Sequence, residues 1–438
     1  MKHTPKGYRL HIGIFGRRNV GKSSLLNAIT RQRVSIVSDR AGTTTDPVEK
    51  PMELLPLGPV LFIDTAGVDD RGALGALRVD RTRQVLNRTD IGVLVTAGYW
   101  GEFEEQLLAE LTTRAVPTVV VFNKRDLVAP PPQLLNKLAH ADVRVVHTTA
   151  TSLAGISDFR QALLDSAPDG FIDNPVILRD LVGPNELAVL VVPVDKEAPR
   201  GRLILPQAQS IRDLLDGHAM SLVVQDTELA AALKHLKHPP RLVVTDSQAF
   251  RQVAKAVPPD VLLTSFSILF SRFKGDLLTQ VAGTLAIEEL LPGDRILVAE
   301  ACSHHPIEDD IGRVKIPRWL REYVGGELHF DTVQGHDFPA ELAPYRLVIH
   351  CGACMLNRRE VLNRILQCRL QNVPITNYGL AISYSLGIFE RALEPFPAAL
   401  ELLRMQALHL PPAETLQGSG RTTAADPEAV AGRPADGR

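Results

Sequence analysis

The chain has 438 residues, of which 45% are hydrophobic and 22% charged, a length that exceeds one ordinary hydrophobic core and predicts more than one domain. Its 48 basic and 50 acidic residues give a formal net charge of −2, so bulk charge provides no attraction for nucleic acid. Between Met1 and Arg9 there is no apolar signal core, and no apolar run approaches the roughly 20 residues of a membrane helix. We therefore expect a cytoplasmic protein that binds neither a membrane nor a nucleic acid.

The first predicted strand, Leu10–Phe15, leads into a glycine-rich loop and then into an amphipathic helix that starts near Ser24. Residues 16–23 read GRRNVGKS, which is the GxxxxGKS pattern in its strand–loop–helix context. Backbone N–H groups of such a loop surround a β-phosphate, and the helix N-terminus adds a favourable dipole. Lys22 would span the β- and γ-phosphates, and the Ser23 hydroxyl would bind magnesium.

A second piece of a nucleotide site follows the predicted strand 60–63. It reads DTAG, from Asp64 to Gly67. The Asp64 carboxylate suits magnesium binding, and the Gly67 amide can sense a γ-phosphate.

Two further pieces select the base. The sequence NKRD, Asn123–Asp126, follows the predicted strand 118–122. The Asp126 carboxylate can accept hydrogen bonds from both N1–H and N2–H₂ of guanine, and adenine lacks this pair of donors. Thr149–Thr151 follows the predicted strand 143–146, where a loop backs the base. The four pieces in this order predict a guanine-nucleotide switch.

Over about residues 8–170 the sequence resembles the TrmE–Era branch of translation-factor-like GTPases. Asp39–Asp46, which reads DRAGTTTD, matches switch I of that branch. The resemblance implies that Thr44 binds magnesium in the GTP state.

Val68 follows the DTAG piece, where Ras-like enzymes have a glutamine that orients water. An apolar side chain cannot orient water, so hydrolysis needs another source of charge. TrmE-like GTPases use a potassium ion held partly by a P-loop asparagine, and Asn19 stands at the matching place. The resemblance therefore predicts potassium-stimulated hydrolysis, and the alternative is that Asn19 is only a tolerated loop residue.

Two sets of residues follow for this module. The predicted catalytic residues are Lys22, Asn19, Thr44 and Gly67. The predicted ligands of GTP, GDP and Mg²⁺ are Gly16, Asn19, Val20, Gly21, Lys22, Ser23, Ser24, Thr44, Asp64, Asn123, Lys124, Asp126, Thr149 and Ala150.

A second module of under 100 residues is predicted over 173–268. Residues 187–192 and 241–244 have the pattern of strands, and 207–215 that of a helix, with prolines between them. The segment contains no catalytic constellation. Its small size favours a structural or self-association role.

A third module is predicted over 269–410, with helix-like runs at 277–291 and 358–370. Two apolar runs, 295–299 and 346–350, are separated by a longer mixed segment and predict parallel strands. Ligands of such sheets gather beyond the carboxyl ends of the strands.

The predicted fold class is α/β with three domains and a tail. The expected units are a P-loop GTPase with a mostly parallel sheet and flanking helices over 1–172, a small α/β domain over 173–268, a Rossmann-like α/β domain over 269–410, and a disordered tail over 411–438, which is rich in Gly, Pro, Ala and Thr.

Three of the four cysteines follow the two apolar runs of the third module. Cys302 follows the first run, and Cys351 and Cys354 form a CxxC after the second. Clustering with histidine favours a metal over a disulfide framework in a cytosolic chain. Three thiolates with a histidine fit tetrahedral zinc, and three thiolates also fit a 4Fe–4S cluster with one iron left for a weaker ligand. Spacing alone does not choose between them.

The pattern CxH…HCxxC downstream of a TrmE-like GTPase resembles the HydF family, the GTPases of FeFe-hydrogenase maturation. Less specific family-like stretches are LILPQ at 203–207 and TSFSIL at 264–269. The resemblance implies that Cys302, Cys351 and Cys354 hold a 4Fe–4S cluster and that the middle module makes a homodimer. It also implies a scaffold that receives a diiron precursor with CO and cyanide ligands, made with two radical-SAM maturases, and delivers it to apo FeFe-hydrogenase.

The fourth iron ligand is open between His304, His350 and Glu300. Each binds iron more weakly than thiolate, which would leave a position for a bridging cyanide. His304 could instead hydrogen-bond to a sulfur, and His350 could simply finish its strand.

Two other functions remain as alternatives. One is a regulatory GTPase with a structural zinc site. The other is a ribosome- or RNA-associated GTPase, which the near-neutral charge and the lack of a KH-type GXXG loop disfavour.

Overall fold

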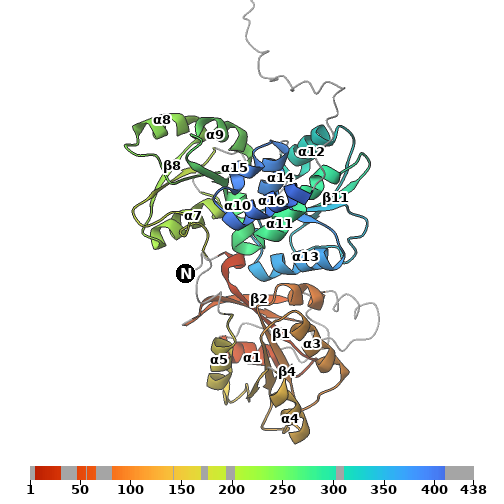
Figure 1. The fold of residues 1–438 in the computed structure, drawn as a ribbon. Coiled ribbons are helices and arrows are strands. Elements are labelled where there is room, and N and C mark those ends of the chain that lie inside the picture. The colour runs from red at the N-terminus through yellow and green to blue at the C-terminus, as the bar shows by residue number, and fades with distance from the viewer. Residues whose placement is uncertain are drawn as a thin grey trace, which may run out of the picture.

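The computed structural model describes residues 5–30, 47–55, 57–65, 81–141, 143–168, 176–193, 203–301 and 310–409. It contains three sheets, each belonging to one α/β unit, and the first unit lies below the other two in Figure 1. The α/β class with a P-loop domain followed by two further α/β units is confirmed. The predicted tail, 411–438, lies outside the described residues.

The first sheet has six strands in the order β2-β3-β1-β4-β5-β6. Only the β2–β3 pair is antiparallel, so the predicted mostly parallel sheet is confirmed. Its central strands β1, β4 and β5 are buried along their whole length and mostly apolar because helices cover both faces. The strands are β1 (Leu10–Phe15), β2 (Val48–Leu54), β3 (Gly58–Asp64), β4 (Ile91–Thr96), β5 (Thr118–Phe122) and β6 (Arg144–His147).

The helices around this sheet bury two hydrophobic clusters, one on each face. They are the short 3-10 helix η1 (Lys6–Tyr8), α1 (Lys22–Thr30), α3 (Glu102–Thr113), α4 (Pro132–His140) and α5 (Ile156–Asp165). Residues 81–87 are also helical. Because α1 starts directly after the glycine-rich loop, its N-terminus faces that loop.

The second sheet has four parallel strands in the order β10-β9-β7-β8. Three of them are buried, whereas the edge strand β8 is exposed or half-buried along its length. The elements are β7 (Leu187–Val191), α7 (Leu205–Asp216), β8 (Met220–Val224), η2 (Asp226–Glu228), α8 (Leu229–His235), β9 (Leu242–Thr245), η3 (Ser247–Ala249), α9 (Phe250–Ala256) and β10 (Leu262–Ser265).

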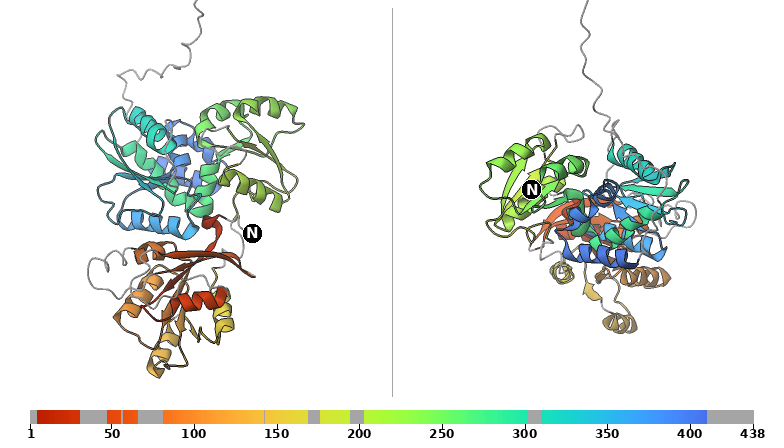
Figure 2. Two further views of the ribbon diagram at one scale, coloured as in Figure 1. Left: turned by 180° about the vertical axis from the view of Figure 1, so that it is seen from behind. Right: turned by 45° about the horizontal axis from the view of Figure 1, so that its top comes forward.

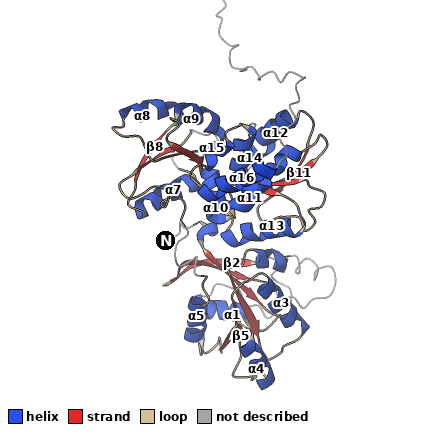
Figure 3. Cartoon of the chain, in the orientation of Figure 1, coloured by secondary structure: helices blue, strands red, loops and turns tan. Residues whose placement is uncertain are grey.

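The third sheet is also parallel, in the order β12-β11-β13-β14. Figures 2 and 3 show its strands among helices on both sides. The elements are α11 (Leu277–Leu285), η4 (Ala286–Glu289), β11 (Arg295–Glu300), the π-helical η5 (Ile311–Lys315), α12 (Ile316–Val324), β12 (His329–Gln334), β13 (Leu347–His350), α13 (Arg358–Leu370), β14 (Ile375–Asn377), α14 (Tyr378–Ser385), α15 (Phe389–Leu393) and α16 (Pro397–His409).

Helix α10 (Phe266–Lys274) joins the second and third units, so the boundary predicted at residue 268 falls inside a helix. Its apolar side chains belong to a core that also includes β7, β9, α11 and α15. In the part of the chain that the structure describes, no helix has the length and apolar character needed to cross a membrane.

Candidate functional site

The two predicted magnesium ligands within the described residues lie side by side. The Ser23 hydroxyl, near the start of α1, donates to Asp64 Oδ2 at the end of β3 over 2.7 Å. The other carboxylate oxygen, Oδ1, is buried and has no hydrogen-bond partner among the described residues. Burial raises the pKa of Asp64, and the Ser23 hydroxyl and Lys22 oppose that shift. A buried oxygen without a donor, beside a hydroxyl, fits Mg²⁺, which prefers oxygen ligands.

The glycine-rich loop has the backbone that a phosphate cradle needs. Gly21 has a φ of +92°, and a Cβ at this position would lie 2.3 Å from Asn123 Nδ2. Asn19 has a φ of +61°, a left-handed conformation that asparagine tolerates better than most residues. Lys22 Nζ donates to Gly16 O and Arg17 O, each over 2.8 Å. The predicted phosphate-binding lysine is therefore held within its own loop.

Asn123 ties the glycine-rich loop to the loop behind the base. Its Nδ2 donates to Val20 O over 3.0 Å. Its Oδ1 accepts from Thr148 Oγ1 and from Ala150 N, both over 3.1 Å. Sequence reasoning singled out Thr149 and Ala150 but missed Thr148, which stands directly after β6 and gave no signal of its own.

Lys124 forms a second tie, because its Nζ donates to Asn19 O over 2.7 Å. Asp126, the residue predicted to read guanine, follows Lys124 by two residues and is exposed. Thr149 pairs with Ala154 through an isolated bridge, and Ser24 lies in the first turn of α1. Thr44 and Gly67, the two remaining predicted residues, lie outside the described residues.

Arg17, inside the glycine-rich loop, has a partner set that sequence reasoning missed. Its Nε donates to Glu104 Oε1 over 2.8 Å, and Glu104 is 1% exposed. The Arg17 guanidinium also lies over the Tyr99 ring, 4.7 Å from the centroid. These contacts connect the loop to α3.

The carboxyl ends of β11 and β13 bring Ala301 and the CxxC loop together. Cys351 Sγ accepts hydrogen bonds from Ala301 N over 3.0 Å and from Ala353 N over 3.4 Å. Ala301 is the residue before Cys302 in the sequence. Cys302 and His304 themselves lie outside the described residues. Among the described residues alone, no group of three His, Cys, Asp or Glu side chains converges as a metal site.

Burial raises the pKa of Cys351 to about 11, and the neighbouring Cys354 adds to the rise. A metal ligand must be the thiolate, so the raised pKa means that Cys351 needs a nearby positive charge to become a ligand. Cys368, by contrast, is fully buried in the apolar core of the third unit. Cys368 is therefore a core cysteine, separate from the CxxC loop.

Both ring nitrogens of His350 have partners. Nδ1 lies 2.8 Å from Cys351 O and Nε2 lies 3.1 Å from Arg364 Nη1. The carbonyl must accept and the guanidinium must donate, so the neutral ring carries its proton on Nδ1. Ligation of iron by His350 would require one of these hydrogen bonds to break.

Glu300, the last residue of β11, is 3% exposed. Arg313 Nη2 donates to its Oε2 over 3.1 Å, and Gln334 Nε2 donates to the same oxygen over 3.2 Å. Tyr378 Oη lies 3.5 Å from Oε1. Oε2 therefore already accepts two hydrogen bonds, whereas Oε1 has only the long Tyr378 contact and can accept a further ligand.

Lys274, at the end of α10, was missed by sequence reasoning. Its side chain is buried, and its Nζ donates to Ala353 O over 2.9 Å and to Cys354 O over 3.1 Å, inside the CxxC loop. Burial lowers the pKa of Lys274 to about 8, and Cys354 and Cys351 raise it. A lysine at a helix C-terminus usually interacts with the helix dipole in solvent, so the sequence gave no reason to place this one under the cysteines.

The first and third units share a polar interface directly behind the CxxC loop. Asn357, three residues after Cys354, caps α13 by accepting from Glu360 N over 3.2 Å. Its Nδ2 donates to Arg88 O over 2.9 Å and to Asp90 Oδ2 over 3.1 Å in the first unit.

A chain of charged and polar side chains crosses the same interface. Arg88 Nη1 lies 3.3 Å from His336 Nε2, and His336 Nδ1 lies 3.0 Å from Glu360. Arg364 then connects Glu360, over 3.2 Å, to His350, over 3.1 Å. Arg88 directly follows the helical residues 81–87, so the network runs from that segment to the residue before Cys351.

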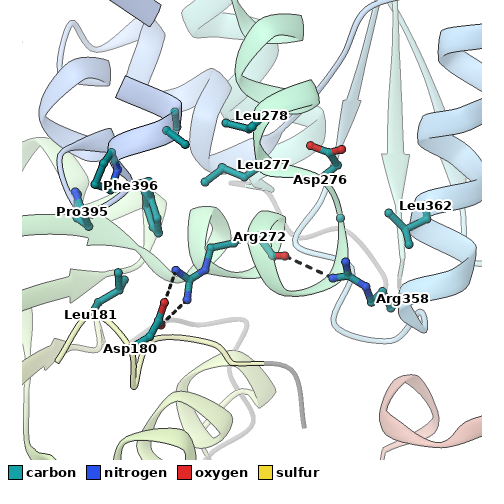
Figure 4. A pocket seen from close by; sticks show the side chains of 14 residues that line it. Asp180, Leu181, Arg272, Asp276, Leu277, Leu278, Arg358, Leu362, Pro395 and Phe396 are labelled. Atoms are coloured by element: carbon teal, nitrogen blue, oxygen red, sulfur yellow. Dashed lines mark hydrogen bonds and ion pairs between the residues drawn. The ribbon is translucent and has the colours of Figure 1, made fainter. Parts of the chain in front are cut away.

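A surface pocket of about 470 Å³ lies between the second and third units. Arg272 of α10 crosses its floor and pairs with Asp180 through Nη2 and Oδ1 over 2.6 Å (Figure 4). Arg358 Nη1 donates to Phe273 O over 2.5 Å. The pocket contains neither nucleotide-binding nor cysteine residues. Its ion pair holds α10 to the second unit, and the Arg358 hydrogen bond holds α10 to the third unit.

These observations define a class of protein: a P-loop GTPase domain followed by two α/β domains, the last of which carries a paired-cysteine loop. The sequence model of the Hydrogen maturase F dimerization domain matches residues 177–275, and that of the Hydrogen maturase F tetramerization domain matches 278–395. Residues 11–124 match the model described as a 50S ribosome-binding GTPase. The chain belongs to the HydF family of hydrogenase maturases.

Curated relatives match only the GTPase part. GTPase Der of Wolinella succinogenes is 40% identical over 123 residues, which cover 27% of this chain and 26% of the relative. The tRNA modification GTPase MnmE of a Nostoc species is 35% identical over 166 residues, covering 37% of this chain and 35% of the relative. The chain thus spans about a quarter to a third of the length of these relatives.

Among solved structures, Aquifex aeolicus Era bound to GDP.AlF4- matches 57% of this chain and 99% of that chain, with 20% identity and a TM-score of 0.34.

Proposed function

We propose that this protein hydrolyses GTP and matures FeFe-hydrogenase as an iron–sulfur scaffold. It would hold a 4Fe–4S cluster through Cys302, Cys351 and Cys354, receive the diiron precursor and deliver it to apo-hydrogenase. The observation that carries the proposal is the hydrogen bond from Ala301 N to Cys351 Sγ, because it brings the chain immediately before Cys302 against the CxxC loop. Membership of the HydF family supports the same role.

The donor set fits an iron–sulfur cluster. Thiolates are the ligands that such clusters prefer, and the Cys351 sulfur already accepts two backbone N–H groups. Glu300 Oε1 is our proposed weaker ligand at the remaining iron, ahead of His350, whose two ring nitrogens are occupied. His304 remains a further proposed ligand from the sequence pattern.

Anaerobic reconstitution with iron and sulfide tests the cluster directly. We expect about four irons per chain and a brown, reducible protein, because the 4Fe–4S type contains four irons. Changing Cys302, Cys351 or Cys354 to Ala should each abolish it. Cys368→Ala is the matched control, since that cysteine is buried in an apolar core. A colourless wild type that holds zinc tightly would instead support the structural-zinc alternative.

For the GTPase reaction we propose that Ser23, Asp64 and Thr44 hold Mg²⁺ and that Lys22 contacts the β- and γ-phosphates. Asn19 would contribute to a potassium site that replaces the missing water-orienting glutamine. We expect faster hydrolysis in potassium than in sodium buffer and no such difference in Asn19→Ala. Equal rates of the wild type in both buffers would contradict the potassium proposal.

We further propose that the nucleotide state alters contacts with the radical-SAM maturases or the hydrogenase. The interface network from Arg88 to His350 supports this, because it connects the segment after the DTAG motif to the cysteine loop. Lys22→Ala should bind GTP poorly and activate hydrogenase less than wild type. Identical activation by both proteins would remove the basis for nucleotide control.

A further inference from the structure

The CxxC loop rests on a buried cation. Lys274 is 1% exposed, and its Nζ donates to Ala353 O, Cys354 O and Leu356 O over 2.9, 3.1 and 2.6 Å. An ammonium has three N–H donors, and all three form hydrogen bonds with carbonyl groups of this loop. The geometry therefore requires the charged form, because a neutral amine has only two N–H groups.

The Glu360 carboxylate acts on this cation from beyond ion-pair distance and is already paired with Arg364 and His336. Among the residues that the structure describes, no Asp or Glu forms an ion pair with Lys274. Backbone carbonyls supply only partial negative charge, and a buried ion without a counter-charge is unfavourable. The cysteine loop is the element that it contacts, so a compensating negative charge is expected there.

A second polar group lies on the same side of the loop. The Tyr8 ring faces the Lys274 ammonium at 4.6 Å from the centroid and stacks on Phe273 at 5.7 Å between centroids. Its hydroxyl is buried and has no hydrogen-bond partner among the described residues. Burial raises the pKa of Tyr8, and the charge of Cys354 adds to the rise. The hydroxyl is thus a buried donor without an acceptor among the described residues, on a ring that contacts the ammonium bound to the CxxC loop.

Both groups are held in place by their surroundings. Two residues before Lys274, Arg272 pairs with Asp180 of the second unit. Gly7, next to Tyr8, packs so closely that an added Cβ would lie 2.4 Å from Leu356 O. Neither side chain can withdraw from the loop without disturbing a domain contact.

We propose that Lys274 and Tyr8 are positioning residues for an anionic metal centre: Lys274 supplies the positive charge that compensates the thiolates of Cys351 and Cys354, and Tyr8 supplies an O–H donor from the same side. This inference rests on the proposed function, in which those thiolates hold a 4Fe–4S cluster. Charge and hydrogen bonds near the sulfurs set the reduction potential of such clusters.

The test measures the midpoint potential and iron content of reconstituted full-length protein. Lys274→Gln keeps two N–H donors for the loop carbonyls but removes the charge. We expect it to retain iron and to disfavour reduction of the cluster at least tenfold, a shift of about 59 mV to lower potential for one electron. Tyr8→Phe keeps the ring and should shift the potential in the same direction by less.

Arg391→Gln is the matched control. Arg391 also donates to three backbone carbonyls, those of Ala254, Val257 and Pro258, over 3.1, 2.7 and 2.9 Å, but away from the cysteines. It should lower thermal stability without changing the potential.

A wild-type potential in a cluster-loaded Lys274→Gln protein would overturn the inference alone. If that variant does not fold, a wild-type potential in Tyr8→Phe would do the same. A wild type that takes up no cluster would overturn the proposed function, and this inference with it.

Discussion

Asn123 shows how one residue can connect separate loops of a nucleotide site. Its side-chain amide forms hydrogen bonds with Val20 O, Thr148 Oγ1 and Ala150 N, and the residue is 2% exposed. Its neighbour Lys124 adds the bond to Asn19 O. These contacts fix the loops relative to one another, so less ordering is left for nucleotide binding.

Asn123→Ala should weaken GTP binding. The change leaves the buried Val20 carbonyl and the partly buried Ala150 N–H without these partners, and an unpaired buried group costs about 1–3 kcal/mol. We expect at least about a tenfold loss of affinity, since 1.4 kcal/mol is tenfold. Titration calorimetry with GTP measures the change. Asn136→Ala, on the exposed face of α4, is the control and should bind GTP as wild type does. Unchanged affinity in Asn123→Ala would contradict the role given to this amide.

We expect His11 to make the first unit sensitive to acid. The residue is 2% exposed, its Nε2 lies 3.0 Å from Lys6 O, and its Nδ1 has no partner among the described residues. Burial lowers the pKa of His11 to about 4, and the nearby Arg88 charge lowers it further. The unfolded chain therefore binds a proton near pH 6.5 that the folded chain does not bind until about pH 4.

Stability should fall as the pH drops from about 6.5 to about 4, by up to about 1.4 kcal/mol per pH unit from this group. Asp90 acts oppositely, because burial raises its pKa to about 6. We therefore compare wild type with His11→Gln. Both proteins contain Asp90, so its opposite effect cancels in the difference between them. The variant should lose less in unfolding temperature between pH 7 and pH 5. An equal loss in the two proteins would show that His11 does not titrate in this way.

At the scale of elements, β8 is more exposed than the other three strands of the second sheet. It lies at the edge, and Met220 and Val223 are 53% and 42% exposed. An exposed apolar edge strand offers unpaired backbone groups to another strand. The match to a dimerization domain over 177–275 supports self-association through this unit, and β8 is the element we propose for it.

If β8 forms the self-association contact, Val223→Lys should lower the mass of the assembly, because the charge would be desolvated at a paired edge. Light scattering coupled to size exclusion measures the mass. Leu55→Lys is the control, since Leu55 is 66% exposed in the turn between β2 and β3. A Val223→Lys protein that stays dimeric at micromolar concentration would exclude β8 as the contact.

At the scale of the whole molecule, Asn357 joins the first unit to the third. Asn357→Asp keeps an N-cap oxygen for α13 but loses both N–H donors and places a second carboxylate beside Asp90. We expect the GTPase domain to unfold in a separate transition at lower temperature than the rest, as measured by calorimetry.

Asn377→Asp is the matched control. Asn377 caps α14 and donates from Nδ2 to Ser267 O over 2.7 Å, a contact that does not involve the first unit. That variant should lose stability without separating the two transitions. If Asn357→Asp and Asn377→Asp gave the same profile, the interface would not depend on Asn357.

Local patterns explain why much of this molecule could be predicted. Each nucleotide motif is a short continuous stretch after an apolar strand, so its spacing alone places it at a strand end. The predicted helix 358–370 matches α13, and the predicted strand 295–299 is extended by one residue in β11. The predicted helix 277–291 ends earlier, because a 3-10 turn, η4, follows α11 at residue 286.

The amino-acid sequence by itself determined the guanine-nucleotide motifs, the order of the α/β units and the paired cysteines after β13, because each depends on residues close together in the chain. Only the tertiary structure decided that Lys274 lies under Ala353, 79 positions away, and that Asn357 reaches Arg88, 269 positions away. Such contacts leave no periodic signal, since they arise when whole units pack and buried polar groups must find partners.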